Sequence, residues 1–246
     1  MSTNPTAHAN DSMFSRSDLI LGDDAMRMLS QVRVAVFGIG GVGSWAAEAL
    51  VRTGLRHITL IDADCVTTSN INRQAPATVS TVGQPKTEAM RAHLLNVNPQ
   101  ADIKAINGIY TAETAGDFNL EEFDYIIDAI DSLSDKALLL LNATAAVRPI
   151  VYSSMGAALK LDPALISVAE FWKVEGCALA RALRTRFRRS GEFPGCKFQC
   201  VYSPESIPQC GDAGANGTFM HITATFGLRL ASLIIEDIYR RTHANK

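Results

Sequence analysis

Short apolar runs alternate with longer amphipathic segments between residues 32 and 155. β-branched and aromatic residues fill the short runs, which predicts buried strands at 32–37, 57–62, 101–106, 123–130 and 149–155. The segments between them predict helices at about 45–52, 86–96 and 133–147. Strands that alternate with helices build parallel sheets, so this pattern predicts an α/β fold with a doubly wound, mostly parallel sheet.

The pattern changes on both sides of this region. Residues 1–12 are polar and predict a disordered tail, and residues 13–30 predict short helices. Residues 157–246 predict a C-terminal extension that belongs to the same domain. The elements expected in it are a strand at 164–171, a basic helix at 177–190, a Gly-, Pro- and Cys-rich loop at about 191–217 and a final helix at about 222–240.

A glycine-rich turn follows the first predicted strand. Gly38, Gly40 and Gly43 fit the pattern G-x-G-x-x-G, which brings the backbone close to a phosphate at a helix N-terminus in Rossmann-like folds. Asp62 ends the second predicted strand, where a carboxylate accepts hydrogen bonds from ribose hydroxyls. These features fit NAD and ATP equally, and the glycines alone also fit a tight turn without a ligand.

The long polar loop at residues 63–85 favours ATP over NAD. Arg73 offers a planar cation with five donors, which suits a polyphosphate. Lys86 begins the next helix, where its charge and the helix dipole both favour anions. Further polar side chains of the segment SNINRQ orient their neighbours or contact the nucleotide: Asn70, Asn72 and Gln74. A nicotinamide-dependent oxidoreductase has no use for this combination.

The segment DAIDS follows another apolar strand. An Asp beside phosphates commonly holds Mg²⁺, and Asp131 is the candidate metal ligand. Asp128 contacts the nucleotide or, alternatively, caps the next helix or orients the loop.

Composition narrows the range of functions. The 246 residues are 47% hydrophobic and 20% charged, which is ordinary for a globular protein, and the net charge of −2 gives no global attraction for nucleic acid. The sequence still allows a local attraction for nucleic acid, because Arg181, Arg184 and Arg188 share one face of the basic helix. This face fits either an RNA backbone or a solvated surface. His221 and Arg229 interrupt the most apolar stretch, residues 218–235, which favours a packed helix over a membrane span.

The five cysteines have no C-x-x-C spacing, so the sequence offers no support for a structural zinc site. The polar N-terminal residues do not form a secretory signal, and we expect reduced thiols and a cytoplasmic protein. Cys177 begins the predicted basic helix, while Cys196, Cys200 and Cys210 lie in one predicted loop. The loop cysteines fit a metal site, a redox pair, a catalytic thiol or, as their spacing favours, unligated thiols.

The segments GIGGVGSW, LIDAD, SNINRQ, GQPKTEAM and DAIDS occur here in the order and approximate spacing typical of the ubiquitin-activating-enzyme-like (ThiF/MoeB/HesA) superfamily, which the chain resembles over residues 13–156. The segments MFSRSDLILG, SSMGAALKLDP, LARALRTRFRRS and CVYSPES are similar to one branch of it, the tRNA threonylcarbamoyladenosine dehydratases. The resemblance implies ATP-dependent dehydration of that tRNA nucleoside to a cyclic hydantoin, through adenylation of its threonyl carboxylate. It also implies Mg²⁺ as cofactor.

The same resemblance implies roles for individual residues. Arg16, Arg73, Lys86 and Asp131 are the implied catalytic set, and Arg16 reaches the site of the other subunit of a homodimer. The implied ATP-binding residues are Gly38, Gly40, Gly41, Gly43, Ser44, Asp62, Asp64, Ser69, Asn70, Arg73, Gln74, Lys86, Asp128, Asp131 and Ser132. Arg181, Arg184 and Arg188 are the implied tRNA contacts, and sulfur-transfer proteins are possible partners.

One alternative lies in the same superfamily: an adenylyltransferase that activates the C-terminus of a ubiquitin-like sulfur-carrier protein. Many such enzymes carry paired C-x-x-C zinc ligands, which this chain lacks. The arginine-rich helix also suits RNA better than the tail of a ubiquitin-like protein.

Overall fold

A seven-stranded sheet forms the centre of the computed structural model, which describes residues 12–211, 214 and 216–244. All but one residue of the predicted tail at 1–12 therefore lie outside the described residues. The strand order is β3-β2-β1-β4-β5-β7-β6, and the pairs are parallel except that β6 runs antiparallel to β7. The prediction of a doubly wound, mostly parallel sheet is confirmed.

The strands are β1 (Arg33–Phe37), β2 (His57–Asp62), β3 (Asp102–Asn107), β4 (Tyr125–Asp128), β5 (Ile150–Ser154), β6 (Ser167–Glu170) and β7 (Gln199–Tyr202). The α-helices are α1 (Ser15–Gln31), α2 (Gly43–Thr53), α3 (Lys86–Val97), α4 (Leu133–Ala145), α5 (Ala178–Ser190) and α6 (Met220–His243). Short 3-10 turns occur between them, including η1 (Thr68–Asn70) and η5 (Phe171–Lys173).

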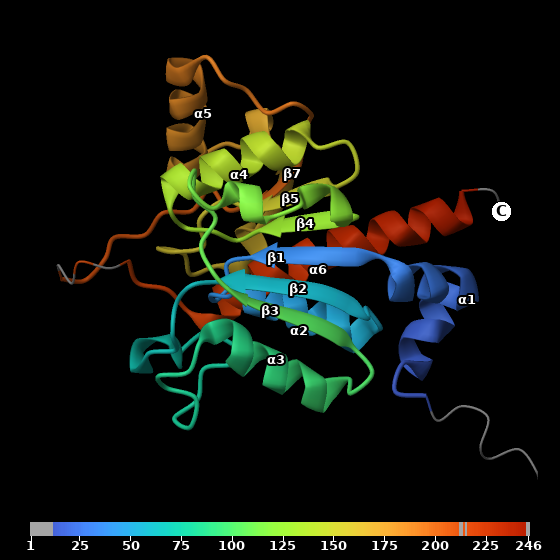
Figure 1. Ribbon diagram of the computed structural model, residues 1–246. Helices are drawn as coiled ribbons and strands as arrows, with labels where there is room; N and C mark the ends of the chain where they lie inside the picture. Colours follow the sequence, from blue (N-terminus) through green and yellow to red (C-terminus); the bar gives the residue numbers. More distant parts are fainter. Residues whose placement is uncertain (1–11, 212–213, 215, 245–246) are drawn as a thin grey trace, which may run out of the picture.

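Helices cover both faces of the sheet (Figure 1). One core joins the sheet to α1, α2, α3 and α6, with Leu50, Phe226 and Ile234 buried in it. The other joins the sheet to α4 and α5 and buries Leu139 and Phe187. Strands β1, β2, β4 and β5 are buried along most of their length, which explains their continuous apolar runs in the sequence.

Helix α6 packs closely along α2. Gly227 makes this approach possible, because a Cβ atom there would lie 2.4 Å from the carbonyl oxygen of Val42. Ile222, Phe226 and Ile234 are buried, so this apolar stretch is the packed helix that its charged and polar residues predicted. Among the described residues, no helix is both long enough and apolar enough to cross a membrane.

Two features differ from the sequence-based expectation. Strand β7 lies inside the segment expected to be a loop, 191–217, and it joins β5 to β6. It has only four residues between Gly- and Pro-rich flanks, so its two fully buried side chains, Cys200 and Val201, left no periodic signal. The N-terminal segment forms α1, which kinks at Gly22, where φ is +72°.

A charged cluster on the helical layer gives a prediction for stability. The Glu48 carboxylate of α2 accepts hydrogen bonds from Arg52 (2.6 Å) and from the His93 ring of α3 (2.8 Å). The bond to Glu48 raises the pKa of His93, although burial opposes this. Burial by itself would raise the pKa of Glu48, but the bonds from His93 and Arg52 outweigh it and lower this pKa.

The cluster should therefore stabilise the fold most between about pH 4.5 and 6.5, the ordinary pKa values of the two groups. Its contribution falls as the pH rises through the raised pKa of His93, or drops through the lowered pKa of Glu48. We expect His93→Gln to cost about 0.5 kcal/mol of unfolding free energy at pH 6 and less at pH 9, since solvent screens the half-exposed ring. Urea denaturation at the two pH values measures this, and equal losses at both would contradict it.

Candidate nucleotide-binding site

The strand order places a crevice between β1 and β4. The chain runs outward from β1 to β2 and β3, then crosses back to β4 on the other side of β1. In doubly wound sheets ligands bind at this switch point, outside the carboxyl ends of the strands. Here the loop after β1, with the glycines, faces the loop after β4, with the DAIDS segment.

Two glycines of the fingerprint are required by close packing. Gly38 has φ +90°, and a Cβ atom there would lie 2.6 Å from the carbonyl oxygen of Ala129, in the loop after β4. A Cβ atom at Gly43 would clash with the carbonyl oxygen of Gly38, where α2 starts against the strand. Gly40 instead faces open space, and its nearest neighbour is the side chain of Gln74. Gly40 is therefore where the backbone of this loop is open to a ligand.

The Cβ position of Gly41 and the hydroxyl of Ser44 face other parts of the chain, so the expected phosphate contacts of these two residues would come from their backbone. A Cβ atom at Gly41 would approach the side chain of Thr223 in α6 to 3.0 Å. The fully buried Ser44 hydroxyl donates to the carbonyl oxygen of Gly40 (2.6 Å) and accepts from the N–H of Ala75 (3.2 Å). Ser44 thus ties the glycine loop to the polar loop after β2.

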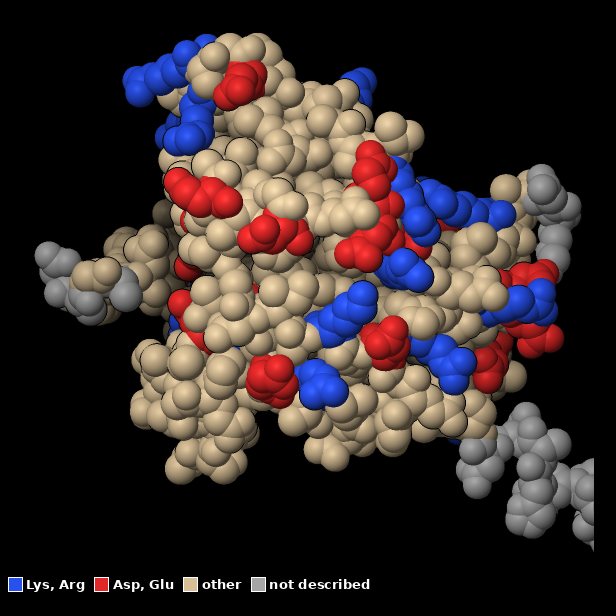
Figure 2. Space-filling model, in the orientation of Figure 1, with Lys and Arg blue, Asp and Glu red and all other residues tan. Residues whose placement is uncertain are grey.

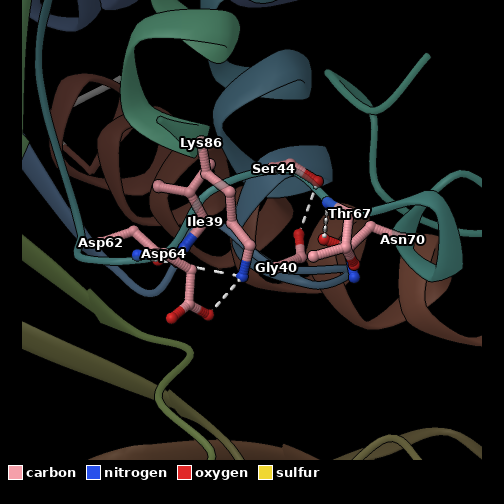
Figure 3. Close-up of polar contacts among 8 residues, drawn as sticks. All are labelled: Ile39, Gly40, Ser44, Asp62, Asp64, Thr67, Asn70 and Lys86. Carbon is pink, nitrogen blue, oxygen red and sulfur yellow. Dashed lines mark hydrogen bonds and ion pairs between the residues drawn. The ribbon is translucent and has the colours of Figure 1, made fainter. Parts of the chain in front are cut away.

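Asp62, Asp64 and Lys86 meet beside the glycine loop (Figure 3). The Asp62 carboxylate accepts from the N–H groups of Ile39 (2.7 Å) and Asp64 (2.8 Å), one at each oxygen. The Lys86 ammonium lies 2.6 Å from Asp64 and 3.9 Å from Asp62. Burial raises the pKa of Asp62, although the Lys86 charge and the two N–H groups favour its charged form. Each oxygen keeps a lone pair that a ribose hydroxyl can use.

The position of Lys86 in the fold favours binding of an anion. It is the first residue of α3, directly after Pro85, and its side chain is 9% exposed. Its nearer carboxylate partner, Asp64, is by contrast largely exposed, at 72%. The ammonium group and the N-terminus of α3 therefore present positive charge to the same crevice.

The loop carrying SNINRQ is held over the start of α2. The Trp45 indole N–H donates to the carbonyl oxygen of Arg73 (2.8 Å), which fixes the backbone there. The Arg73 guanidinium donates to the backbone oxygen of Ser69 and to Asn72, both at 2.9 Å. Asn70 is buried, and its side-chain oxygen accepts from the N–H of Thr67 within a capping box, so it shapes the loop.

Gln74 carries an unsatisfied polar atom in this crevice. It is buried, its amide nitrogen faces Gly40, and its Oε1 has no hydrogen-bond partner among the described residues. Buried polar atoms are nearly always paired in native structures, so an orphan beside the glycine loop points to a missing ligand or water. The hydroxyl of Thr87, next to Lys86, is a second such atom and was not expected from the sequence.

Asp128 is not placed to contact a nucleotide, which corrects one candidate. It is fully buried and pairs with the equally buried Lys136 of α4 at 2.7 Å. The Ser153 hydroxyl donates to the same carboxylate (2.6 Å), and the N–H of Ile130 donates to its other oxygen (3.2 Å). Lys136 also donates to the carbonyl oxygen of Ile130 (2.9 Å). The pair thereby holds both backbone groups of the residue before Asp131.

Lys136 was missed by sequence reasoning. The available signal was a lysine within the apolar face of the helix after DAIDS, one turn from that segment. Ser132 is the N-cap residue of α4 and makes no side-chain capping bond. Asp131 itself is exposed and has no hydrogen bond or ion pair within the described part of the chain.

Asp131 fits the Mg²⁺ ligand expected from the sequence. Within the described residues, no three His, Cys, Asp or Glu side chains gather as a metal site. Mg²⁺ does not require such a group, because it is commonly held by one or two carboxylates together with substrate phosphates and water. A single exposed carboxylate at the crevice suits this mode.

Arg16 and the basic helix lie apart from the crevice. Arg16 is on α1. This helix lies at the side of the sheet where β1 begins, opposite to the carboxyl ends of the strands (Figure 1). The implied role of Arg16 therefore requires a second copy of the chain. Arg184 was expected to share an exposed face of the helix with Arg181 and Arg188. Its guanidinium instead donates to the backbone oxygens of Phe171 (3.1 Å) and Val174 (2.8 Å). Arg181 and Arg188 are exposed.

The cysteines are free thiols, and none of the five approaches another as a disulfide. Cys177 is buried and donates to the carbonyl oxygen of Met155 (2.9 Å), while burial raises the pKa of the Cys200 thiol. Cys196 and Cys210 are exposed. Cys65 is also exposed; it follows Asp64 in the loop after β2 and pairs with Pro85 in an isolated β-bridge.

The model of the ThiF family matches residues 14–235. The chain belongs to the ThiF family. The resemblance inferred from the motifs is therefore confirmed. Family relatives include the tRNA threonylcarbamoyladenosine dehydratase of Bacillus subtilis, 41% identical over 78% of this chain and 75% of the relative. The Escherichia coli dehydratase is 35% identical over 86% of this chain and 80% of the relative.

Solved structures of the family match the whole fold. The Escherichia coli dehydratase TcdA in complex with ATP has a TM-score of 0.86 and 32% identity, covering 95% of this chain and 96% of that one. Its complex with AMP has a TM-score of 0.87 and 31% identity, covering 99% and 100% of the two chains. The Escherichia coli molybdopterin-synthase adenylyltransferase is 34% identical, but over 56% of this chain and 54% of the relative.

Proposed function

We propose that this protein is an ATP-dependent tRNA threonylcarbamoyladenosine dehydratase, which closes that nucleoside to its cyclic hydantoin form. The observation that carries the proposal is the crevice between β1 and β4, which combines an open Gly40, the Asp62 carboxylate and Lys86 within a chain that aligns almost end to end with dehydratases. This supports the reading favoured from the sequence. The adenylyltransferase alternative is weaker. One such relative matches only 56% of this chain, and those that match 84–89% of it are 28–30% identical and are covered over less than half of their own length.

The first chemical step is activation of a carboxylate. An oxygen of the threonyl carboxylate attacks the α-phosphorus of ATP, a P–O bond forms, and pyrophosphate leaves with the electrons of the broken bond. Negative charge grows on the phosphate oxygens in the transition state. Lys86 and Arg73 supply positive charge there, while Asp62 holds the ribose.

The second step is ring closure. A nitrogen of the threonylcarbamoyl group attacks the activated carbonyl carbon, AMP leaves, and the nitrogen loses its proton. The net change is loss of one water from the nucleoside, with ATP converted to AMP and pyrophosphate. Because nucleophile and electrophile belong to one molecule, their proximity supplies much of the rate, and no enzyme thiol is needed.

We also propose that Mg²⁺ binds with ATP at Asp131, where it would neutralise charge on the phosphates. The residues that act around it are those of the chain. Asp131 provides the carboxylate, and the buried pair of Asp128 and Lys136 keeps the preceding residue in place. An ATP analogue complex with Mn²⁺ in place of Mg²⁺ would locate the ion.

A homodimer completes the proposed site. Helix α1, which carries Arg16, lies away from the carboxyl ends of the strands, and we infer that the Arg16 guanidinium reaches an ATP site from a second copy. We further propose that Arg181 and Arg188 contact the tRNA backbone, that the enzyme works in the cytoplasm with its tRNA, and that sulfur-transfer proteins are partners. Arg184 is left out of the tRNA contacts because its donors are used internally.

The decisive experiment is incubation with ATP, Mg²⁺ and tRNA that carries threonylcarbamoyladenosine. We expect nucleoside mass spectrometry to show loss of one water from the modified base, and nucleotide analysis to show AMP. A matched tRNA without the modification should release no AMP above background. An unchanged nucleoside would contradict the dehydratase function, and ADP in place of AMP would replace adenylation with phosphorylation of the carboxylate.

A further inference from the structure

The positive charge of this protein is concentrated in one segment. Residues 171–198 contain seven Lys or Arg and two Glu, a net charge of +5. The remaining residues contain sixteen Lys or Arg and twenty-three Asp or Glu, a net charge of −7. Figure 2 shows Lys and Arg side chains gathered over the end of α5 that projects from the body of the molecule. A local field of this sign attracts a polyanion although the whole chain is acidic.

Two exposed aromatic rings lie within this basic segment. Trp172, in η5, is 39% exposed, and Phe193, after α5, is 54% exposed. Their ring centroids are 6.1 Å apart with an interplanar angle of 44°. The Arg188 guanidinium lies 5.8 Å from the centroid of Trp172. Exposed aromatic surface next to an arginine suits a planar ligand with negative charge nearby.

Buried neighbours hold Trp172 and its turn in place. Phe171 is fully buried, meets Trp172 edge-on at 5.1 Å and stacks on Phe198 at 5.0 Å. Arg184 fastens both ends of this turn through the carbonyl oxygens of Phe171 and Val174. The Glu170 side chain accepts from the backbone N–H of Trp172 (3.2 Å). Trp172 therefore loses little conformational freedom when a ligand binds, which favours affinity.

We propose that Trp172, Phe193 and Arg188 form a stacking platform for an unpaired base of the tRNA substrate, with neighbouring cations on its phosphates. Recognition of RNA relies on unstacked bases that lie on aromatic rings or arginine planes, combined with a basic groove for the backbone. The cations available around the rings are Lys173, Arg189 and Lys197. A protein partner would call for a broader apolar centre depleted of charge.

The platform is connected to the ATP site by α5. This helix begins beside the carboxyl end of β5, where the Cys177 thiol donates to the carbonyl oxygen of Met155. Thirteen residues of helix extend about 20 Å. Arg181, Arg186 and Arg189 line a groove between α5 and α4 along this length. One RNA arm can thus follow α5 from the crevice to the platform, and the inference rests on the proposed tRNA substrate.

The test uses a synthetic anticodon stem-loop of the tRNA, without the modification, as the RNA probe. We expect Trp172→Leu and Phe193→Leu each to weaken binding about 10-fold, because stacking on an aromatic ring contributes strongly per base. Trp172→Phe should retain most of the affinity, since it keeps an aromatic face. The probe should quench tryptophan emission in the wild type and not in Trp172→Leu. Tyr239→Leu, a similarly exposed aromatic residue on α6, is the matched control.

Unchanged affinity in both leucine variants, or quenching that survives Trp172→Leu, would overturn the platform and leave this surface to a protein partner. Melting temperature and ATP affinity, measured in parallel, show that the variants fold. Failure of the platform is distinct from failure of the proposed function. If only the platform is wrong, the wild-type enzyme still removes water from modified tRNA. If the proposed function is wrong, no water is lost, whatever the stem-loop binding shows.

Discussion

Asp131→Ala is expected to lower the rate of hydantoin formation at least about 100-fold while the fold stays intact. The side chain is exposed and has no partner in the described part of the chain, so its removal leaves no buried group unpaired. Its loss would instead remove the carboxylate that we assign to Mg²⁺, and preorganised charge at a reacting phosphate commonly contributes a factor of about 100 to 1000. Single-turnover assays with modified tRNA measure the effect.

Asp102→Ala is the matched control, because Asp102 is also exposed but begins β3, at the end of the strands opposite to the crevice. This variant should turn over like the wild type. Asp131→Glu should recover part of the activity with a higher Mg²⁺ requirement, since the carboxylate is kept but displaced. Full activity of Asp131→Ala at limiting Mg²⁺ would remove this residue from the metal role.

Lys136→Met should destabilise the protein by about 3–5 kcal/mol, because it leaves the fully buried Asp128 carboxylate without its cation. Such a loss is a large part of the stability of a typical domain. The backbone oxygen of Ile130 also loses its donor, so the loop that carries Asp131 is no longer fixed. We therefore expect a raised Mg²⁺ requirement for turnover in any variant that still folds. Urea denaturation and Mg²⁺ titration of activity measure the two effects.

The double variant Lys136→Met, Asp128→Asn is informative because it removes the unpaired charge. It should be more stable than Lys136→Met alone, although the loop stays loosened. Lys104→Met, on the exposed face of β3, is the control and should change stability by less than about 0.5 kcal/mol. An unfolding midpoint of Lys136→Met equal to that of the wild type would show that the pair contributes nothing to stability.

The regular elements were predictable where their hydrophobic pattern was long or repeated. The strands at 32–37 and 57–62 and the helix after Lys86 were placed within a residue or two of the observed elements. Strand β7 was not, because four residues carry too little periodicity and its pairing with β5 and β6 is non-local. Its place in the sheet is decided by partners 29 to 47 residues away along the chain.

The candidate site shows the same division. Its residue types and their order identified a phosphate crevice, since Gly38, Asp62 and Lys86 follow from local rules of strand ends and helix starts. Those rules could not separate residues that face the ligand from residues that support them. For Asp128 the sequence left open a nucleotide contact or a role in orienting the loop, and the buried pair with Lys136 and the bond from Ser153 favour the second.

By itself, the sequence determined the α/β fold, the family and an ATP-type crevice, because periodicity and motif spacing are properties of local chain segments. Only the tertiary structure decided which side of the sheet each loop serves. In the folded protein Asp128 pairs with Lys136, and Gly41 packs against Thr223. Arg184 binds the backbone of Phe171 and does not join Arg181 and Arg188 as an RNA contact. These outcomes depend on packing between segments far apart along the chain, where desolvation makes a buried polar group without a partner costly.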